Sequence, residues 1–471
     1  MMRNKKESPI IEKIEITDIA AEGKAIAKHE GKVIFVPYVA PGDIVDLKIT
    51  RKRRSYAEGT AIKFHEYSKD CTEPFCEHFG ICGGCKWQHL SYEKQLHYKA
   101  KQVVDNLERI AKVPFPEPLP IIGSDSIKHY RNKLEYTFSD KRWFLPDEPF
   151  DQPASEIPGL GFHIPGRFDK VLDLKHCYLQ PELSDKIRIA VKKYSIENEL
   201  SYQNLRNHEG LLRNLIVRNS NTGEWMVIVV FGEEENKDAQ IALMDFLKQS
   251  FPEITSLWYV INTKANDSIH DLEPQLHFGK PYLSEKMMHM EYQIGPKAFY
   301  QTNSEQAEKL YQIAYDFSQL TGDELVYDLY TGTGTIANLL ANKAKEVVGV
   351  EYIEEAILDA RKNSEINNVK NTTFIAGDMK DVLNSSFLEK HGYPDVIVTD
   401  PPRAGMHPKV IESILEATPK KIVYISCNPA TQARDIALMQ PNYTISKVQP
   451  VDMFPNTHHV ENIILLTRSE N

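Results

Sequence analysis

Apolar and polar residues alternate in short runs from residue 10 to about 65. Ile14 and Ile16 are flanked by polar residues, as are Val45, Leu47 and Ile49, and turn-forming Gly and Pro residues separate the runs. Several short strands in so small a segment predict a five-stranded, OB-like β-barrel over residues 1–66. Barrels of this type often bind RNA, but the fold alone does not determine a function.

A helical period replaces this alternation after Ser91, which is a predicted N-cap. It places Leu96, Val103, Leu107 and Ile110 on one apolar face. The proline-rich residues 111–125 predict a linker.

Strand-like runs dominate residues 126–295. They predict a strand over 130–139, a hairpin over 212–231 and one helix over 238–248. The segment 141–158, rich in Pro and Asp, predicts an irregular insertion. We therefore expect a central, mainly β domain over residues 67–295.

Strands and helices alternate from residue 296 to 471. A helix predicted over 304–320 is followed by short apolar strands, which end near Tyr330, Val350, Ile375, Thr399 and Ile425. This alternation predicts a Rossmann-like α/β domain with a mainly parallel sheet, in which ligands bind at the carboxyl ends of the strands. Because 471 residues exceed one ordinary core, we expect three domains.

The composition is typical of a soluble globular protein, with 41% hydrophobic and 26% charged residues. No apolar run reaches the roughly 18 residues of a membrane span, and the charged N-terminus lacks a signal-peptide core. We therefore expect a cytoplasmic protein without membrane attachment. The net charge of −10 argues against a nucleic-acid-binding surface over the whole molecule, but Arg51, Lys52, Arg53 and Arg54 form a compact basic run.

Four of the six cysteines, namely Cys71, Cys76, Cys82 and Cys85, lie close together in the sequence. In a reducing compartment such a cluster favours a metal over disulfides. Three neighbouring thiolates and one remote thiolate can hold either zinc or a 4Fe–4S cluster. Zinc sites usually contain two C-x2-C pairs, and only one is present here, which favours the iron–sulfur cluster.

A glycine turn, Asp328 to Gly334, lies between a predicted strand and a predicted helix. Gly332 within it lets the backbone approach a ligand. Glu351 ends the next strand, about twenty residues on, where a carboxylate accepts hydrogen bonds from ribose hydroxyls. Alone, this pattern fits NAD, S-adenosylmethionine or a tight turn. Asp378, after the third strand, is placed to meet an adenine edge. Asp400-Pro401-Pro402, after the fourth strand, is typical of S-adenosylmethionine enzymes that methylate nucleobases.

Cys427 follows an apolar strand and precedes Asn428-Pro429. Methylation at uracil C5 requires a thiolate that adds to C6, and then a base that removes the C5 proton. Cys427 is the single cysteine of the α/β domain, and Glu461, just before the last strand, is the natural base. Asp400 is placed to anchor or polarise the uracil. The structural alternatives are a buried thiol at 427 and a solvated carboxylate at 461.

Together these motifs resemble the RNA uracil-5-methyltransferase family, and its iron–sulfur rRNA branch in particular. The resemblance covers nearly the whole chain and implies that the first domain is an RNA-binding TRAM domain. The resemblance also implies the following assignments: 4Fe–4S ligands Cys76, Cys82, Cys85 and Cys177, contacts to S-adenosylmethionine from Gln301, Tyr330, Glu351 and Asp400, nucleophile Cys427 and base Glu461.

Two positions depart from the family pattern. Thr331 stands in the glycine turn where many members have cysteine, a change between small residues. Cys71 has no clear family role. It is an alternative ligand to Cys76, although the spacing to Cys82 and Cys85 favours Cys76.

RNA enzymes of this kind act on loop bases that are turned out of the stack. The candidate RNA contacts are Arg51, Arg53, Arg54, Arg131, Lys133, Arg213 and Phe299. We expect a monomer that methylates 23S rRNA. The alternatives are a tRNA T-loop uracil-5-methyltransferase, a non-catalytic RNA-binding or ribosome-assembly factor, and an RNA cytosine-5-methyltransferase.

Overall fold

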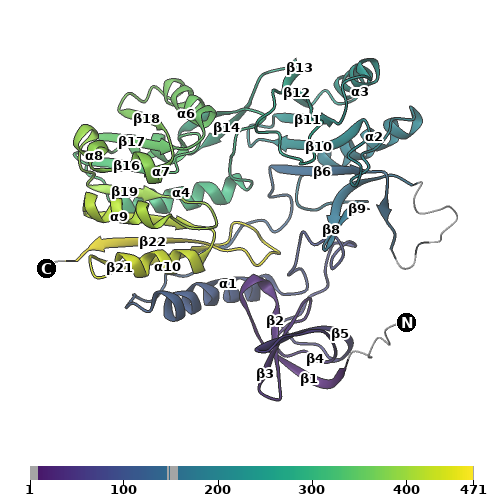
Figure 1. Cartoon of the computed structure of the whole chain (residues 1–471), viewed down its shortest axis with the longest axis horizontal. Coiled ribbons are helices and arrows are strands. Elements are labelled where there is room, and N and C mark those ends of the chain that lie inside the picture. Colours follow the sequence, from purple (N-terminus) through teal and green to yellow (C-terminus); the bar gives the residue numbers. More distant parts are fainter. Residues whose placement is uncertain (1–8, 146–147, 149–156, 470–471) are drawn as a thin grey trace.

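The computed structural model describes residues 9–145, 148 and 157–469. Figure 1 shows a small barrel at the N-terminal end, a central sheet, and a C-terminal sheet covered by helices. Most of the predicted insertion at 141–158 lies outside the described residues. No helix of the described part combines the length and apolar character that a membrane crossing needs.

The N-terminal strands close into a barrel in the order β1-β2-β3-β5-β4, as the alternating pattern predicted. Side chains such as Ile16, Ile34 and Leu47 fill its interior and are at most 2% exposed. The strands are β1 (Ile10–Ile19), β2 (Ala25–His29), β3 (Lys32–Val36), β4 (Ile44–Lys52) and β5 (Tyr56–Glu66), with a short helical turn η1 (Ala21–Gly23) after β1.

Helix α1 (Tyr92–Asn106) follows Ser91 as predicted and continues into a π-helical turn, η2 (Leu107–Ala111). The predicted apolar face is partly wrong. Ile110 is 41% exposed, whereas the polar residues Gln95 and Lys99 are buried beside Val103. They are buried because α1 runs along the C-terminal sheet and its helix α10 (Pro429–Met439) (Figure 1). Asn456 and Asp452, after strand β21 (Tyr443–Val451) of that sheet, are their polar partners.

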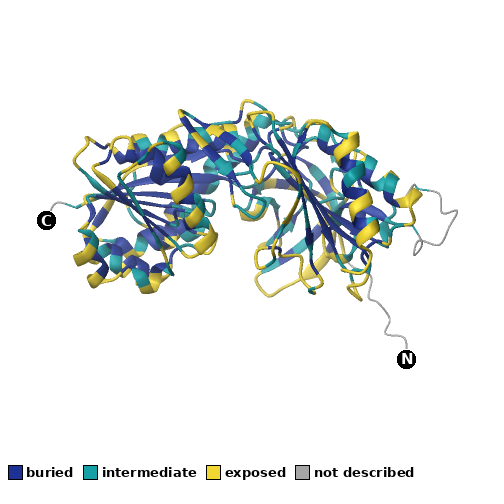
Figure 2. Cartoon of the chain, turned by 90° about the horizontal axis from the view of Figure 1, so that it is seen from above, coloured by how far each residue is buried: buried dark blue, intermediate teal, exposed yellow. Residues whose placement is uncertain are grey.

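The central sheet has eight strands in the order β13-β12-β11-β10-β6-β8-β9-β7. Its middle strands are buried on both faces, because alternate residues of β10 and β11 enter two different cores. Figure 2 shows these strands as a dark blue layer with exposed helix faces outside it. The elements are β6 (Lys133–Ser139), β7 (Arg142–Trp143), β8 (Gly159–Ile164), β9 (Arg167–Asp173), α2 (Leu183–Glu197), β10 (Leu212–Asn219), β11 (Trp225–Phe231), α3 (Lys237–Ser250), β12 (Ile254–Ile261) and β13 (Gln275–Gly279).

A two-stranded hairpin, β14 (Leu283–Met287) and β15 (Met290–Ile294), follows the central sheet. Met287, Met290, Tyr292 and Ile294 belong to the same core as helix α4 (Ser304–Ser318) and one face of the C-terminal sheet, whereas Leu283 packs in a core of the central sheet. Residues before 295 thus contribute to the C-terminal core, and the division of the chain at that point remains a proposal.

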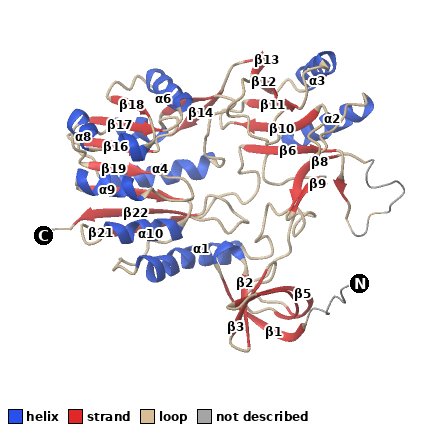
Figure 3. Cartoon of the chain, viewed as in Figure 1, coloured by secondary structure: helices blue, strands red, loops and turns tan. Residues whose placement is uncertain are grey.

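The C-terminal sheet has seven strands in the order β18-β17-β16-β19-β20-β22-β21. The first five strands are parallel to one another. β22 pairs antiparallel with both β20 and β21, so β21 runs in the same direction as the first five. Helices lie on both faces (Figure 3), which explains why the inner strands β19 and β20 are buried almost throughout. The elements are β16 (Leu325–Leu329), α5 (Thr335–Ala341), β17 (Glu346–Glu351), α6 (Glu354–Ile366), β18 (Thr372–Ala376), α7 (Met379–Val382), α8 (Ser385–His391), β19 (Val396–Thr399), α9 (Pro408–Ala417), β20 (Lys421–Ser426), β21 (Tyr443–Val451) and β22 (Glu461–Arg468).

Candidate active site and cysteine site

The strand order reverses between β16 and β19, which is where open α/β sheets bind their ligands. Leu329 pairs with Thr399, so Tyr330 and Asp400 leave the sheet side by side. The glycine turn follows β16. Gly332 has a φ of 54°, and its amide donates to Glu351 Oε2 at 3.1 Å, so the turn and the acidic end of β17 are joined.

Asp328 lies beneath this turn and is fully buried. Thr331 Oγ1 donates to its Oδ2 at 2.5 Å, but its Oδ1 has no hydrogen-bond partner among the described residues. Burial raises the pKa of Asp328 to about 7, and the charges of Asp400 and Glu351 contribute. A buried, unpartnered acceptor beside further carboxylates suits a cationic ligand. Asp328 belongs to the predicted glycine motif but was not among the predicted contacts.

The nucleophile and base predicted from the sequence come together through strand pairing. Ser426 at the end of β20 pairs with Asn462 at the start of β22, so the adjacent residues Cys427 and Glu461 are neighbours. Glu461 is 6% exposed and Cys427 is half-buried. Asn428 caps helix α10 and also donates to Arg403 O at 3.0 Å, which fixes the turn that carries the thiol.

Burial and mutual repulsion dominate the electrostatics at this turn. Burial raises the pKa of the Cys427 thiol to about 11, and the charges of Glu461 and Asp400 raise it further. Burial also raises the pKa of Glu461 to about 8 and that of Asp400 to about 7. Arg403 acts in the opposite direction: its charge lowers the pKa of both Cys427 and Glu461, and it also hydrogen-bonds the thiol.

Sequence analysis missed Arg403, although it directly follows the Asp400-Pro401-Pro402 motif. It also missed Tyr311 on α4, which is buried among the acidic groups. Burial raises the pKa of Tyr311, the charge of Asp400 contributes, and Gln301 hydrogen-bonds its hydroxyl. In the sequence, only the position of Tyr311 on the predicted helix was apparent, and that position does not distinguish a functional tyrosine from a core residue.

Two central-domain groups support the segment that carries Gln301. The side chain of Asn132 donates to Gln301 O at 2.8 Å, and its main-chain amide donates to Thr302 O at 2.8 Å. Asp378, another predicted donor contact, caps α7 and pairs with Lys380, whose side-chain and main-chain hydrogen bonds lower the pKa of Asp378.

The four predicted metal ligands line one cavity. Cys76, Cys82 and Cys85 approach it from the loop before α1, and Cys177 approaches it from the segment after β9. Burial raises the pKa of Cys85 and Cys177 to about 12, and nearby cysteines contribute in each case. In this conformation no three His, Cys, Asp or Glu side chains within the described ranges are arranged to hold a metal ion. The assignment of a metal therefore rests on the shared cavity and on the chemistry of four thiols.

Cys71 lies apart from this cavity. Its thiol contacts Asp43 Oδ1 at 3.5 Å, and its backbone bridges to Leu90. The structure thus favours Cys76 over Cys71 in the group of four.

One predicted RNA contact needs correction. Arg213 is 2% exposed, and its guanidinium binds Asp267 and the carbonyl oxygens of Asn262 and Asn266. It holds the loop after β12 and has no donor to offer RNA.

The other predicted RNA contacts differ in exposure. Arg51, Arg53 and Arg54 are exposed where β4 turns into β5, and Phe299 is 71% exposed. Arg131 and Lys133 are half-buried: Lys133 pairs with Glu135 at 2.6 Å, and the guanidinium of Arg131 lies over the Phe454 ring at 5.7 Å.

Comparisons with known proteins agree with this architecture. The tRNA (uracil-5-)-methyltransferase model matches residues 273–469, and the TRAM domain model matches residues 11–62. A Bacteroides thetaiotaomicron protein described as an uncharacterized RNA methyltransferase is 57% identical, covering 95% of this chain and 99% of its own. A similarly described Chlorobaculum tepidum protein is 39% identical, and the match covers 97% of this chain and 96% of that protein.

A solved structure shares the whole architecture. The tRNA (uracil-54, C5)-methyltransferase of Pyrococcus abyssi, in complex with S-adenosyl-L-homocysteine, superposes with a TM-score of 0.74 at 28% identity, covering 96% of this chain and 99% of its own. The fold and site therefore define an S-adenosylmethionine-dependent RNA methyltransferase. More particularly, the chain belongs to the RNA (uracil-5-)methyltransferase family, with an N-terminal TRAM domain.

Proposed function

We propose that this enzyme methylates C5 of a uridine in 23S rRNA, with Cys427 as the nucleophile and Glu461 as the base. The observation that carries the assignment is the pairing of β20 with β22, which brings the two side chains together at the ligand-binding edge of the sheet. We assign Asp400, which follows the neighbouring strand β19, to anchor or polarise the uracil ring; its charge acts on both Cys427 and Glu461.

The chemistry follows from these positions. The Cys427 thiolate adds to C6 and leaves an electron pair at C5 as an enolate. C5 then takes the methyl group, whose bonding electrons remain with the donor sulfur. Glu461 removes the C5 proton, the C5–C6 double bond forms again, and the thiolate is expelled. Arg403 favours the thiolate, since it lowers the pKa of Cys427 against burial.

S-adenosylmethionine, when bound, supplies the methyl group as a cationic sulfonium. We assign Gln301, Tyr330, Gly332, Glu351, Asp378 and Asp400 to its site, and add Asp328. The support is the reversal of the strand order between β16 and β19, together with the unpartnered Oδ1 of Asp328.

The choice of 23S rRNA rests on the likeness of the cysteine motif to the iron–sulfur rRNA branch. A tRNA T-loop substrate is the second candidate, because the Pyrococcus abyssi tRNA enzyme superposes on 96% of this chain. The overall architecture therefore does not discriminate between these substrates.

One experiment tests both substrate and mechanism. Wild-type and Cys427→Ala protein are incubated with labelled methyl donor and separate rRNA and tRNA pools, and 5-methyluridine is mapped. We expect label in 23S rRNA with the wild type and none with Cys427→Ala. Label in tRNA alone would reject the substrate, and an active Cys427→Ala protein would reject the mechanism.

We also propose that Cys76, Cys82, Cys85 and Cys177 bind a 4Fe–4S cluster. Buried thiols need a cation to stay ionised, and these four line a single cavity. Anaerobically purified protein should absorb visible light and contain iron. Cys177→Ser should lose the metal and Cys71→Ser should retain it. A colourless wild-type protein with stoichiometric zinc would overturn the assignment.

A further inference from the structure

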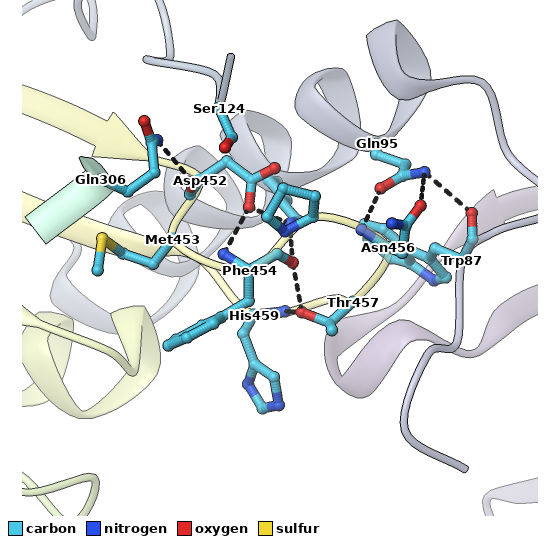
Figure 4. Close-up of polar contacts among 12 residues, drawn as sticks. Trp87, Gln95, Ser124, Gln306, Asp452, Met453, Phe454, Asn456, Thr457 and His459 are labelled. Carbon is cyan, nitrogen blue, oxygen red and sulfur yellow. Dashed lines mark hydrogen bonds and ion pairs between the residues drawn. The ribbon is translucent and has the colours of Figure 1, made fainter. Parts of the chain in front are cut away.

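A polar segment, residues 452–459, joins β21 to β22 and ends two residues before Glu461. We call it the strap. Figure 4 shows that partners from several parts of the chain converge on it. Asp452, Met453 and Asn456 are at most 1% exposed. The strap is thus buried, although it has no regular secondary structure.

Helix α1 binds the first half of the strap through charge. The side chains of Lys99 and Asp452 are both fully buried, and Lys99 Nζ lies 2.5 Å from Asp452 Oδ1. Lys99 also donates to Phe454 O at 3.0 Å, and Tyr92 donates its hydroxyl to Asp452 Oδ2 at 2.9 Å. A buried ion pair contributes little net stability but is costly to break on one side, so it enforces one geometry.

The cysteine loop binds the second half of the strap. The main-chain amides of Lys86 and Trp87, which directly follow Cys85, both donate to Asn456 O, at 2.9 and 3.0 Å. The Gln95 side chain donates to Asn456 Oδ1 at 3.3 Å and accepts from its amide at 2.8 Å (Figure 4). Asn456 has a φ of 64°, a conformation that asparagine tolerates better than most residues.

The strap is also joined to the donor side of the site. Gln306 donates to Asp452 O at 2.7 Å (Figure 4), and Asn303 donates to Met453 O at 3.0 Å. Both lie at the start of α4, just after Gln301. Beyond these contacts the strap folds onto itself, because Thr457 Oγ1 donates to Phe454 O at 2.7 Å. Its path therefore determines where β22, and with it Glu461, begins.

We propose that Lys99, Gln95 and Asn456 are positioning residues for the methylation reaction. They hold the strap so that the carboxylate of Glu461 reaches the proton on C5 after methyl transfer. The main-chain amides that follow Cys85 join this geometry to the cysteine loop. This inference rests on the proposed roles of Cys427 and Glu461.

The two chemical stages provide a specific readout. Cys427 attaches to RNA before Glu461 acts, and it is released only after proton removal. A displaced Glu461 therefore leaves methylated RNA covalently bound to the protein, whereas a merely less stable protein loses adduct and product together.

The test compares Lys99→Met with Lys101→Met at a temperature where thermal unfolding shows both folded. Lys101 lies on the same helix but pairs with Asp105 and Asp18 at the partly exposed surface. We expect Lys99→Met to lower turnover by about tenfold or more, since small misplacements cost that much. Denaturing gels with labelled methyl donor should show a larger fraction of covalent methylated RNA than with the wild type. Lys101→Met should match the wild type.

Asn456→Gly provides a second variant, because glycine keeps the positive φ and loses only the side-chain bonds. It should also accumulate adduct, to a smaller extent. The Glu461→Gln protein separates the two hypotheses. If it forms no adduct, the proposed function itself fails. If it accumulates adduct but folded Lys99→Met and Asn456→Gly do not, the positioning role is wrong.

Discussion

At the scale of single residues, the proposed active site contains buried carboxyl groups whose ionised forms are destabilised by burial. Burial raises the pKa of Asp328 and Asp400 to about 7 and that of Glu461 to about 8. A carboxyl group with a raised pKa in the folded state binds its proton more tightly there than in the unfolded chain. Each such group therefore lowers stability as the pH rises from its ordinary value toward the folded one.

Glu461→Gln should therefore stabilise the protein in a pH-dependent manner. The ordinary pKa of this group is 4.5 and the folded value is about 8. The gain in melting temperature over the wild type should be small near pH 5 and should grow up to about pH 8, because only the wild type must keep a buried proton. Thermal unfolding of the ligand-free proteins across this range measures it.

Glu412→Gln, on the exposed surface of α9, serves as the control and should show no such trend. An equal gain for Glu461→Gln at every pH would contradict the raised pKa.

Candidate functional residues could be named from the sequence only where a motif marked them. Cys427 and Glu461 stand at the borders of apolar strands, and the structure places them together. Arg403 and Tyr311 carry no such mark, because an arginine after a turn and a tyrosine on an amphipathic helix usually have structural roles. Arg213 was predicted as an RNA contact because a charged residue in a strand usually lies at the surface. In the fold it is bound by a loop 49 to 54 residues away in sequence.

At the scale of elements, a strand of the central sheet supports the loop that we assign to the methyl-donor site. Arg218 on β10 is 3% exposed, and its Nη1 donates to Gly295 O at 3.1 Å and to Ala298 O at 3.0 Å. Those carbonyl groups begin the segment that leads to Phe299 and Gln301. The central sheet therefore fixes one wall of the proposed methyl-donor site.

Arg218→Met should weaken binding of S-adenosylhomocysteine by about tenfold, which corresponds to about 1.4 kcal/mol. The reason is that the freed carbonyl groups let the loop before Gln301 move. Calorimetric titration of the folded variant measures the change. Arg167→Met, at an exposed end of β9, should bind as the wild type does. An unchanged affinity for Arg218→Met would show that the loop holds its shape without the guanidinium.

Helix α1 shows how packing overrides periodicity. Its length and start were predicted, since Ser91 and the helical spacing of apolar residues mark them. Its buried face was not, because Gln95 and Lys99 find buried partners on a strap more than 350 residues later in the chain. Such partners cannot be inferred from the helix itself.

At the scale of the whole molecule, the acidic chain carries a local basic surface, to which we assign RNA binding. Arg51, Arg53 and Arg54 are exposed on the barrel, at one end of the molecule (Figure 1). The proposed active site lies at the C-terminal sheet. An RNA that reaches both the barrel and the proposed active site would bind through the barrel and react at the edge of the C-terminal sheet.

Replacing Arg51, Arg53 and Arg54 with serine should weaken RNA binding and its dependence on salt, by up to about two units of slope for three lost phosphate contacts. The turnover at saturating RNA should remain unchanged. Binding titrations at several salt concentrations measure both effects. Serine at the three exposed residues Lys186, Lys193 and Lys237 removes the same charge from α2 and α3, and it should have little effect. Equal losses in both variants would indicate only a general charge effect.

The sequence by itself determined the elements, the barrel and the α/β sheet, because periodicity and turn residues act over short distances. It also carried the motifs at positions 328–334, 400, 427 and 461 on which the proposed chemistry rests. Tertiary structure alone decided the groups around those positions. Strand pairing placed the thiol beside the carboxylate, burial raised their pKa values, and a polar strap tied the base to a helix and a cysteine loop far away in sequence. These effects depend on distance in space and on exclusion of water, which only the folded chain specifies.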